Sequence, residues 1–94
     1  MTTIIAIHEV EDGEQWARAW RKKGAGSRQE LMAKAGATAR TFHDPQNPNL
    51  TGFIIEVSDM TKFQAFMQSD ESRQAMAEDR VKPETFRILD EFTP

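Results

Sequence analysis

The sequence of 94 residues contains no cysteine. This absence excludes disulfide bonds, thiolate catalysis and thiolate metal sites. Long apolar runs are missing as well, because the opening run covers only residues 4–7 and has no basic flank. Such a run is too short for the core of a signal peptide or for a membrane span. We therefore expect no membrane partner and, by default, a cytoplasmic protein.

Charge of one sign is also missing. Twelve Lys and Arg residues are mixed among fifteen Asp and Glu residues, which gives a net charge of −3 and no basic run along one face. Nucleic acid and anionic membranes are therefore not expected as partners. The hydrophobic fraction of 38% and the charged fraction of 29% are those of an ordinary globular protein. The length predicts a single domain over residues 1–94 with a modest core, for which oligomerisation is a common supplement.

What is present is a regular alternation of strand and helix patterns. Two helical patterns begin after the capping residues Asp12 and Asp59, and each is interrupted once, at residues 24–26 and 69–72. The segment "DPQNPN" predicts a turn between the second and third strands. The order β-α-β-β-α-β predicts an α+β, ferredoxin-like fold, an antiparallel four-stranded sheet with the helices on one face. The four predicted strands cover residues 3–10, 37–43, 50–58 and 85–92.

The central strands are apolar on both sides. Ile5 and Ile7 alternate with Ile4 and Ala6 in the first strand, and the third strand shows the same pattern. The helices cover only one face of such a sheet, so an apolar second face predicts another covering layer. We expect this layer to be the sheet of a second copy, which makes the protein a homodimer.

Several segments of the chain resemble a known superfamily. The segments "HEVEDGEQW", "TARTFHDPQNPNLTGFIIEVSDMTKFQAFMQSDESRQAM" and "PETFRILDE" are similar to the dimeric α/β-barrel superfamily, which includes antibiotic-biosynthesis-monooxygenase-like proteins. Within it, the chain resembles a small, mostly uncharacterised bacterial branch. His8, Trp16, the "DPQNPN" turn and the "MQSDESRQAM" helix start carry the resemblance. It implies a ferredoxin-like subunit in a dimeric α/β barrel, but the superfamily contains monooxygenases, isomerases, haem-degrading enzymes and proteins without known activity.

His8 is a titratable residue on an otherwise apolar strand face, and Glu56 is the single charge of the third strand. If the two side chains share a face of the sheet, the carboxylate would orient the imidazole, and the pair could act as a general base or bind a polar ligand group. The alternative is a structural pair, or two residues on opposite faces. Structural histidines are the more frequent case.

Other candidates are weaker. Trp16, Phe42 and Arg40 are the expected substrate-binding residues, with the two aromatic rings as cavity walls and Arg40 as the group that holds an anionic substrate. For Trp16 a core position is the alternative, and for Arg40, as for Arg87, protection of an edge strand is the preferred one. His43 precedes a turn and is expected in solvent. No ligand spacing predicts a metal site, and no cofactor is expected.

These observations leave two functions open. The first is the binding or conversion of a small organic molecule in a cavity between sheet and helices, as in a cofactor-independent oxygenase or isomerase. The second is a non-catalytic ligand-binding or stress-related dimer. The first strand has no asparagine, and both tryptophans belong to a predicted helix. The sequence departs here from the asparagine, tryptophan and histidine constellation of the monooxygenase branch, and whether it is an enzyme stays open.

Overall fold

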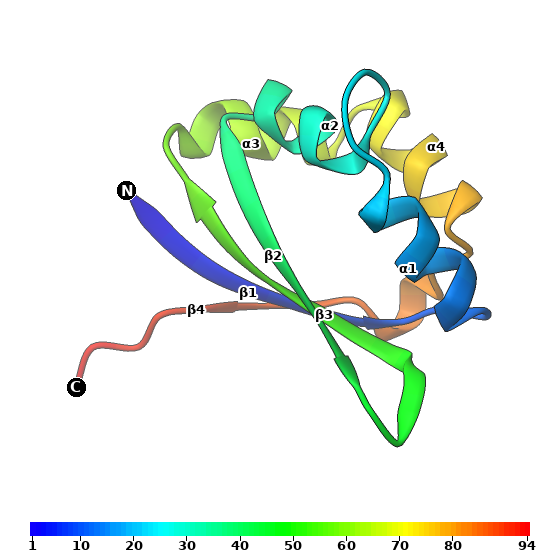
Figure 1. Cartoon of the computed structure of the whole chain (residues 1–94). Helices are drawn as coiled ribbons and strands as arrows, with labels where there is room; N and C mark the ends of the chain where they lie inside the picture. The colour runs from blue at the N-terminus through cyan, green and yellow to red at the C-terminus, as the bar shows by residue number, and fades with distance from the viewer.

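The sheet and its helical cover form two layers. The computed structural model describes all residues, 1–94. Four antiparallel strands lie in the order β2-β3-β1-β4, and the helices pack on one face of the sheet (Figure 1). The strands are β1 (Thr2–Glu9), β2 (Ala37–Asp44), β3 (Asn47–Val57) and β4 (Arg87–Asp90). The helices are α1 (Gly13–Arg21), α2 (Arg28–Lys34), α3 (Met60–Met67), α4 (Asp70–Glu78) and the 3₁₀ turn η1 (Pro83–Thr85). The predicted ferredoxin-like α+β arrangement is confirmed, including the interruption of both helical segments.

Short polar side chains determine where the helices begin. The carboxylate of Asp12 accepts hydrogen bonds from the backbone N–H groups of the first turn of α1, and Asp59 does the same for α3. Ser27 and Ser69 cap α2 and α4 through their hydroxyl oxygens. These caps satisfy donors that have no partner within a helix. The side chain of Gln15, in the first turn of α1, donates to the carbonyl oxygen of Glu78.

The register between the two central strands decides which side chains face the helices. His8 pairs with Thr51 and Ala6 pairs with Phe53, so the even-numbered residues of β1 share a face with the odd-numbered residues of β3. This face is buried under the helices and forms the core. The buried strand residues on it are Ile4, Ala6, His8, Ala37, Ala39, Thr51, Phe53, Ile55 and Val57.

Two elements differ from the sequence prediction. The turn between β2 and β3 involves only residues 45 and 46, because Asn47 already pairs with Asp44 in a hairpin. The last strand is four residues long instead of eight, since Pro83 begins a 3₁₀ turn before it. Proline lacks the N–H group that a strand donates to its neighbour, so the chain turns after the bridge between Val10 and Val81, and pairing with β1 resumes at Arg87.

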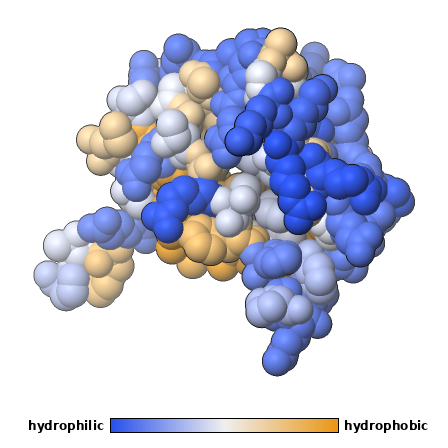
Figure 2. Space-filling model, viewed as in Figure 1, coloured by the Kyte–Doolittle hydropathy of each residue, from blue (hydrophilic) through white to orange (hydrophobic).

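The opposite face of the sheet carries no helix, and we call it the open face. Ile5 is paired with Ile54 on one side and with Leu89 on the other, which makes an apolar row across three strands. Ile5 and Leu89 keep 40% and 50% of their surface exposed. Apolar atoms gather along the lower side of the molecule, below the largely hydrophilic helical layer (Figure 2). Both sides of the central strands are therefore apolar, as predicted, and the chain alone covers one of them.

Candidate functional site

A hollow of about 80 Å³ lies between the sheet and the helices, and we call it the inner cavity. β1 and β3 form its floor, and residues of all four α-helices form its walls and roof. Hydrophobic side chains make up thirteen of the seventeen lining residues. The polar lining residues are His8, Arg28, Ser72 and Asp79.

His8 lies in the floor of the inner cavity and is 3% exposed. Its ring makes one hydrogen bond, in which Nδ1 lies 2.8 Å from Oγ1 of Thr51. The same hydroxyl donates to the backbone carbonyl oxygen of His8 at 2.9 Å. A hydroxyl has one proton, so with that proton on the carbonyl bond, Nδ1 is the nitrogen that carries hydrogen. Nε2 is then left with a free lone pair.

The free nitrogen of His8 is open to the cavity. The indole Nε1 of Trp20 is the single buried side-chain nitrogen or oxygen without a partner, so the unpaired Nε2 of His8 is not fully enclosed by protein. Burial lowers the pKa of the His8 ring, and the smaller opposing effects of its own backbone carbonyl and of the Asp79 charge do not cancel this shift. A lowered pKa keeps the ring neutral at pH 7, and a neutral imidazole can accept a proton.

Aromatic rings hold the imidazole in place. The ring of Phe86 is stacked on it with centroids 5.8 Å apart, and Phe53 meets it edge-on at 5.3 Å. Trp16 adds a second edge contact at 6.4 Å. These contacts surround His8 with apolar surface, which explains the lowered pKa and limits rotation of the ring.

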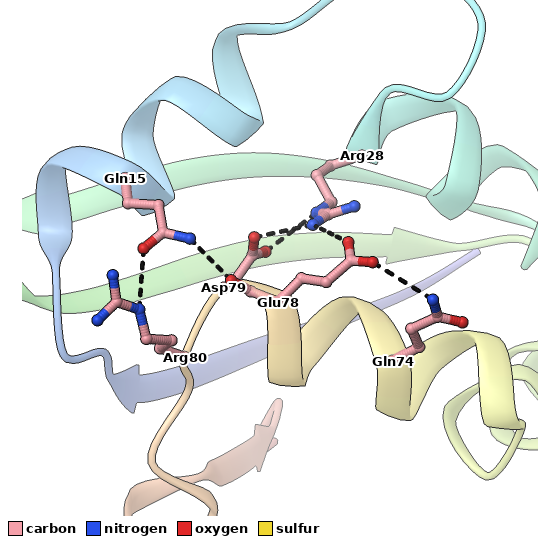
Figure 3. A network of polar contacts seen from close by, with 6 residues as sticks. All are labelled: Gln15, Arg28, Gln74, Glu78, Asp79 and Arg80. Carbon is pink, nitrogen blue, oxygen red and sulfur yellow. Dashed lines mark hydrogen bonds and ion pairs between the residues drawn. The ribbon is translucent and has the colours of Figure 1, made fainter.

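A polar network closes the helical layer beside the inner cavity. The Nε and Nη2 atoms of Arg28 donate to the two carboxylate oxygens of Asp79 at 3.0 and 2.8 Å, and Nη2 also reaches Glu78 at 3.3 Å. The hydrogen bond to Asp79 raises the pKa of Arg28 further. Gln15 joins α1 to this network through the backbone of Glu78 and the side chain of Arg80 (Figure 3). The network thus ties α1, α2 and the end of α4 together.

The predicted pair of His8 and Glu56 does not form. Glu56 pairs with Thr3 across the β1–β3 ladder, and its carboxylate accepts a hydrogen bond from the Thr3 hydroxyl at 2.8 Å on the open face. His8 points to the helices. Successive side chains alternate between the two faces, and Glu56 lies five positions along β3 from Thr51, so the two side chains lie on opposite faces, which is the alternative that the sequence left open. Thr51 takes the place beside the imidazole that was assigned to the carboxylate.

The predicted substrate-binding residues are divided between two places. Trp16 is 4% exposed and lines the inner cavity, whereas Phe42 lies near the open face with Arg40 stacked on its ring, the guanidinium carbon 5.6 Å from the centroid. Arg40 and Arg87 lie on the edge strands β2 and β4, as predicted. Phe42 also borders a hollow of about 340 Å³ between α1 and β2, which we call the outer groove. Its lining residues are Trp16, Ala17, Trp20, Arg21, Thr41, Phe42 and His43.

Sequence reasoning missed Thr51, Arg28 and Asp79. Thr51 carried a signal, since it is a polar residue in phase with Phe53 and Ile55 on an apolar strand face. Arg28 and Asp79 are 51 residues apart, and no pattern in the sequence connects them.

No group of three or more His, Asp or Glu side chains in the structure is arranged to hold a metal ion. None of the helices has both the length and the apolar character that crossing a membrane requires.

No protein-family model matches the sequence, and no curated protein matches it. A solved structure described as the crystal structure of an antibiotic biosynthesis monooxygenase superimposes with a TM-score of 0.64, at 16% sequence identity and over 100% of both chains. The chain has the antibiotic biosynthesis monooxygenase fold. At this identity, the similarity establishes the ferredoxin-like architecture of the subunit, and the function has to be argued from the residues of the site.

Proposed function

We propose that this protein binds a small organic molecule in the inner cavity, with Nε2 of His8 as the acceptor for an acidic proton of the ligand. The observation that carries the proposal is a buried imidazole beside an apolar cavity, with Nδ1 hydrogen-bonded to Thr51 and no protein partner at Nε2. Apolar cavities with a few convergent polar groups are the usual form of ligand sites. Trp16 serves as a wall of this site.

The chemistry of such a site is proton abstraction. A neutral Nε2 can take the proton of a hydroxyl or of an activated C–H group, and the positive charge that results on the ring is stabilised by the nearby carboxylate of Asp79. The ligand anion is then the electron-rich form that reacts with dioxygen or is protonated again at another atom. A cofactor-independent oxygenase or isomerase is therefore the conversion that we propose for this site.

The site also supports a second candidate, a non-catalytic ligand-binding dimer. No carboxylate is hydrogen-bonded to His8, and the inner cavity of about 80 Å³ lies below the usual range of ligand sites, about 300–1,000 Å³. Turnover separates the two candidates. NMR of a bound ligand shows deuterium exchange or product with an enzyme and an unchanged ligand with a binder.

We further propose that the open face is the contact between two copies of the chain. The apolar row of Ile54, Ile5 and Leu89 is continuous across three strands, and a two-fold axis would place the same row of a partner opposite to it. Arg40 ends this row at the β2 edge. Charged residues at the rim and apolar residues at the centre are typical of protein interfaces.

Two probe molecules test the ligand proposal. Phenol and toluene differ by a hydroxyl in place of a methyl group, so a free acceptor in the cavity should favour phenol by about tenfold, the equivalent of one hydrogen bond. His8→Leu should abolish this preference, and His43→Leu, which removes the other histidine of the chain, should leave it unchanged. The affinities are measured by calorimetry after circular dichroism has shown that both variants fold. Equal binding of phenol to the wild type and to His8→Leu would contradict the proposal.

A further inference from the structure

Two hollows meet at the same pair of indole rings. Trp16 and Trp20 line the inner cavity on one side and the outer groove on the other. Their ring centroids are 6.3 Å apart, and the Trp20 ring also lies 4.8 Å from the ring of Phe53 in the cavity floor. The two tryptophans thus stand between a hollow of about 80 Å³ and a groove of about 340 Å³.

Trp20 is the more exposed of the two tryptophans. Trp16 is 4% exposed in the middle of α1, whereas Trp20 is partly exposed in the last turn of the helix. The chain that follows, residues 22–27, has no helix or strand and contains Gly24 and Gly26 with positive φ. Trp20 therefore lies next to a segment without regular secondary structure, and one side of the residue is exposed to solvent.

The indole N–H of Trp20 has no hydrogen-bond partner and is the one such buried side-chain group in the chain. Buried donors are almost always paired, and an unpaired donor destabilises the state that encloses it. Either a ligand oxygen beside the ring or an outward rotation of the ring would satisfy this N–H group. The unpaired donor therefore points to a ligand or to a second ring position.

The lining of the outer groove includes one cationic residue, Arg21, and no carboxylate. Thr41 and His43 are its other polar residues. Trp20 adds aromatic surface next to these groups, whereas the ring of Phe42 lies near the open face with Arg40. A guanidinium group beside aromatic rings suits an anionic group better than a neutral one. The inner cavity, in contrast, is apolar and has flexible methionine side chains in its wall, Met32, Met67 and Met76.

We propose that the inner cavity and the outer groove are two compartments of one ligand site, joined when the Trp20 side chain moves. The site takes an elongated molecule with an apolar end in the inner cavity and an anionic end beside Arg21. This inference rests on the proposed binding of a ligand in the inner cavity and adds the shape and charge of that ligand. The two volumes together fall within the usual range of ligand sites, which the inner cavity alone does not reach.

Linear carboxylates are suitable probes. Binding of butyrate, hexanoate, octanoate and 1-octanol to the full chain is measured by calorimetry and by tryptophan fluorescence, which reports directly on Trp16 and Trp20 because the chain has only two tryptophans. We expect octanoate to bind at least tenfold more tightly than 1-octanol. Affinity should rise by up to about fourfold for each added methylene group that enters the apolar compartment.

Matched variants assign the two ends of the ligand. Arg21→Gln should reduce octanoate binding to the level of 1-octanol, whereas Arg18→Gln, on the same helix but outside the groove lining, should not. Ala75→Leu fills the inner cavity and should remove the dependence on chain length, and Ala77→Leu on the exposed side of α4 is its control. Thermal melting shows whether each variant folds, and the chain-length series of the wild type needs no variant at all.

The outcomes separate this inference from the proposed function. If octanoate binding depends on Ala75→Leu but not on Arg21→Gln, the inner cavity binds ligands alone and the two-compartment site is wrong. Binding that depends on Arg21 but not on chain length would place the carboxylate in the groove only, which also refutes the inference. If the inner-cavity variants affect neither these probes nor phenol, the proposed function fails as well.

Discussion

Thr51→Val is the substitution that tests the floor of the site most directly. The Thr51 side chain is 1% exposed, and its hydroxyl makes the only hydrogen bond of the His8 ring. Valine has nearly the same size, so the change creates no cavity and removes only the hydroxyl. A lost hydrogen bond destabilises a protein by about 0.5–1.5 kcal/mol, and a buried polar group left without a partner adds about 1–3 kcal/mol.

We therefore expect Thr51→Val to lower the free energy of unfolding by about 2 kcal/mol. For a domain of this size, about 2 kcal/mol corresponds to a decrease in Tm of roughly 8–16 °C. The measurement is urea unfolding followed by circular dichroism at one fixed protein concentration, because dimerisation would make stability depend on concentration. Thr41→Val, exposed on β2 and without a side-chain hydrogen bond, is the control and should change stability by less than about 0.5 kcal/mol.

A stability change in Thr51→Val no larger than that of the control would refute the argument that the hydroxyl anchors the imidazole. Nitrogen-15 NMR gives an independent check. The wild type should show the hydrogen of the neutral His8 ring on Nδ1, and a ring with its hydrogen on Nε2 would mean that the cavity is offered a donor instead of an acceptor. In Thr51→Val this tautomer preference should weaken.

Three further predictions concern charge and assembly. Because burial lowers the pKa of His8 in the folded state, the unfolded chain binds a proton at this ring more readily than the folded chain. The contribution of the neutral His8 ring to stability is therefore complete above the ordinary histidine pKa of about 6.5 and is lost as the pH falls towards the lowered pKa. Urea titrations at several pH values should show this loss in the wild type and not in His8→Leu. Asp79→Asn leaves Arg28 without its bidentate partner and should lower the unfolding free energy by about 1–3 kcal/mol, less than for a fully buried pair because Glu78 remains near, and an unchanged urea midpoint would contradict this. Analytical ultracentrifugation should find a dimer that Ile5→Glu on the open face dissociates and Gln64→Glu on the exposed side of α3 does not, and a monomeric wild type would overturn the interface.

The sequence was sufficient for those features that depend on alternation and capping. Asp12 and Ser69 mark helix starts by local chemistry, and the apolar pattern of both sides of β1 follows from a period of two residues. The relative register of two strands is different, because each strand alone allows either parity. His8 pairs with Thr51 and lies on the face opposite to Glu56. This register is determined by the packing of the whole sheet.

Contacts between distant helices were beyond sequence reasoning for a related reason. Arg28 and Asp79 look like ordinary surface residues, one in the first turn of α2 and one after the end of α4. Only the folded helical layer brings them to 2.8 Å. The same applies to Trp20, whose spacing from Trp16 predicts a core anchor, while its unpaired N–H group and its place between two hollows depend on the surrounding side chains.

The first strand has a consequence for how this protein would be regulated. One set of its side chains, with His8 among them, lines the inner cavity, and the alternate set, with Ile5 and Ile7, forms the centre of the open face. Ligand and partner would therefore act on the two sides of one rigid backbone segment. By thermodynamic linkage, any ligand that shifts this segment changes the dissociation constant of the dimer, and dimer formation changes ligand affinity by the same factor. The ligand affinity of such a protein would then change with protein concentration, because concentration sets the fraction of dimer.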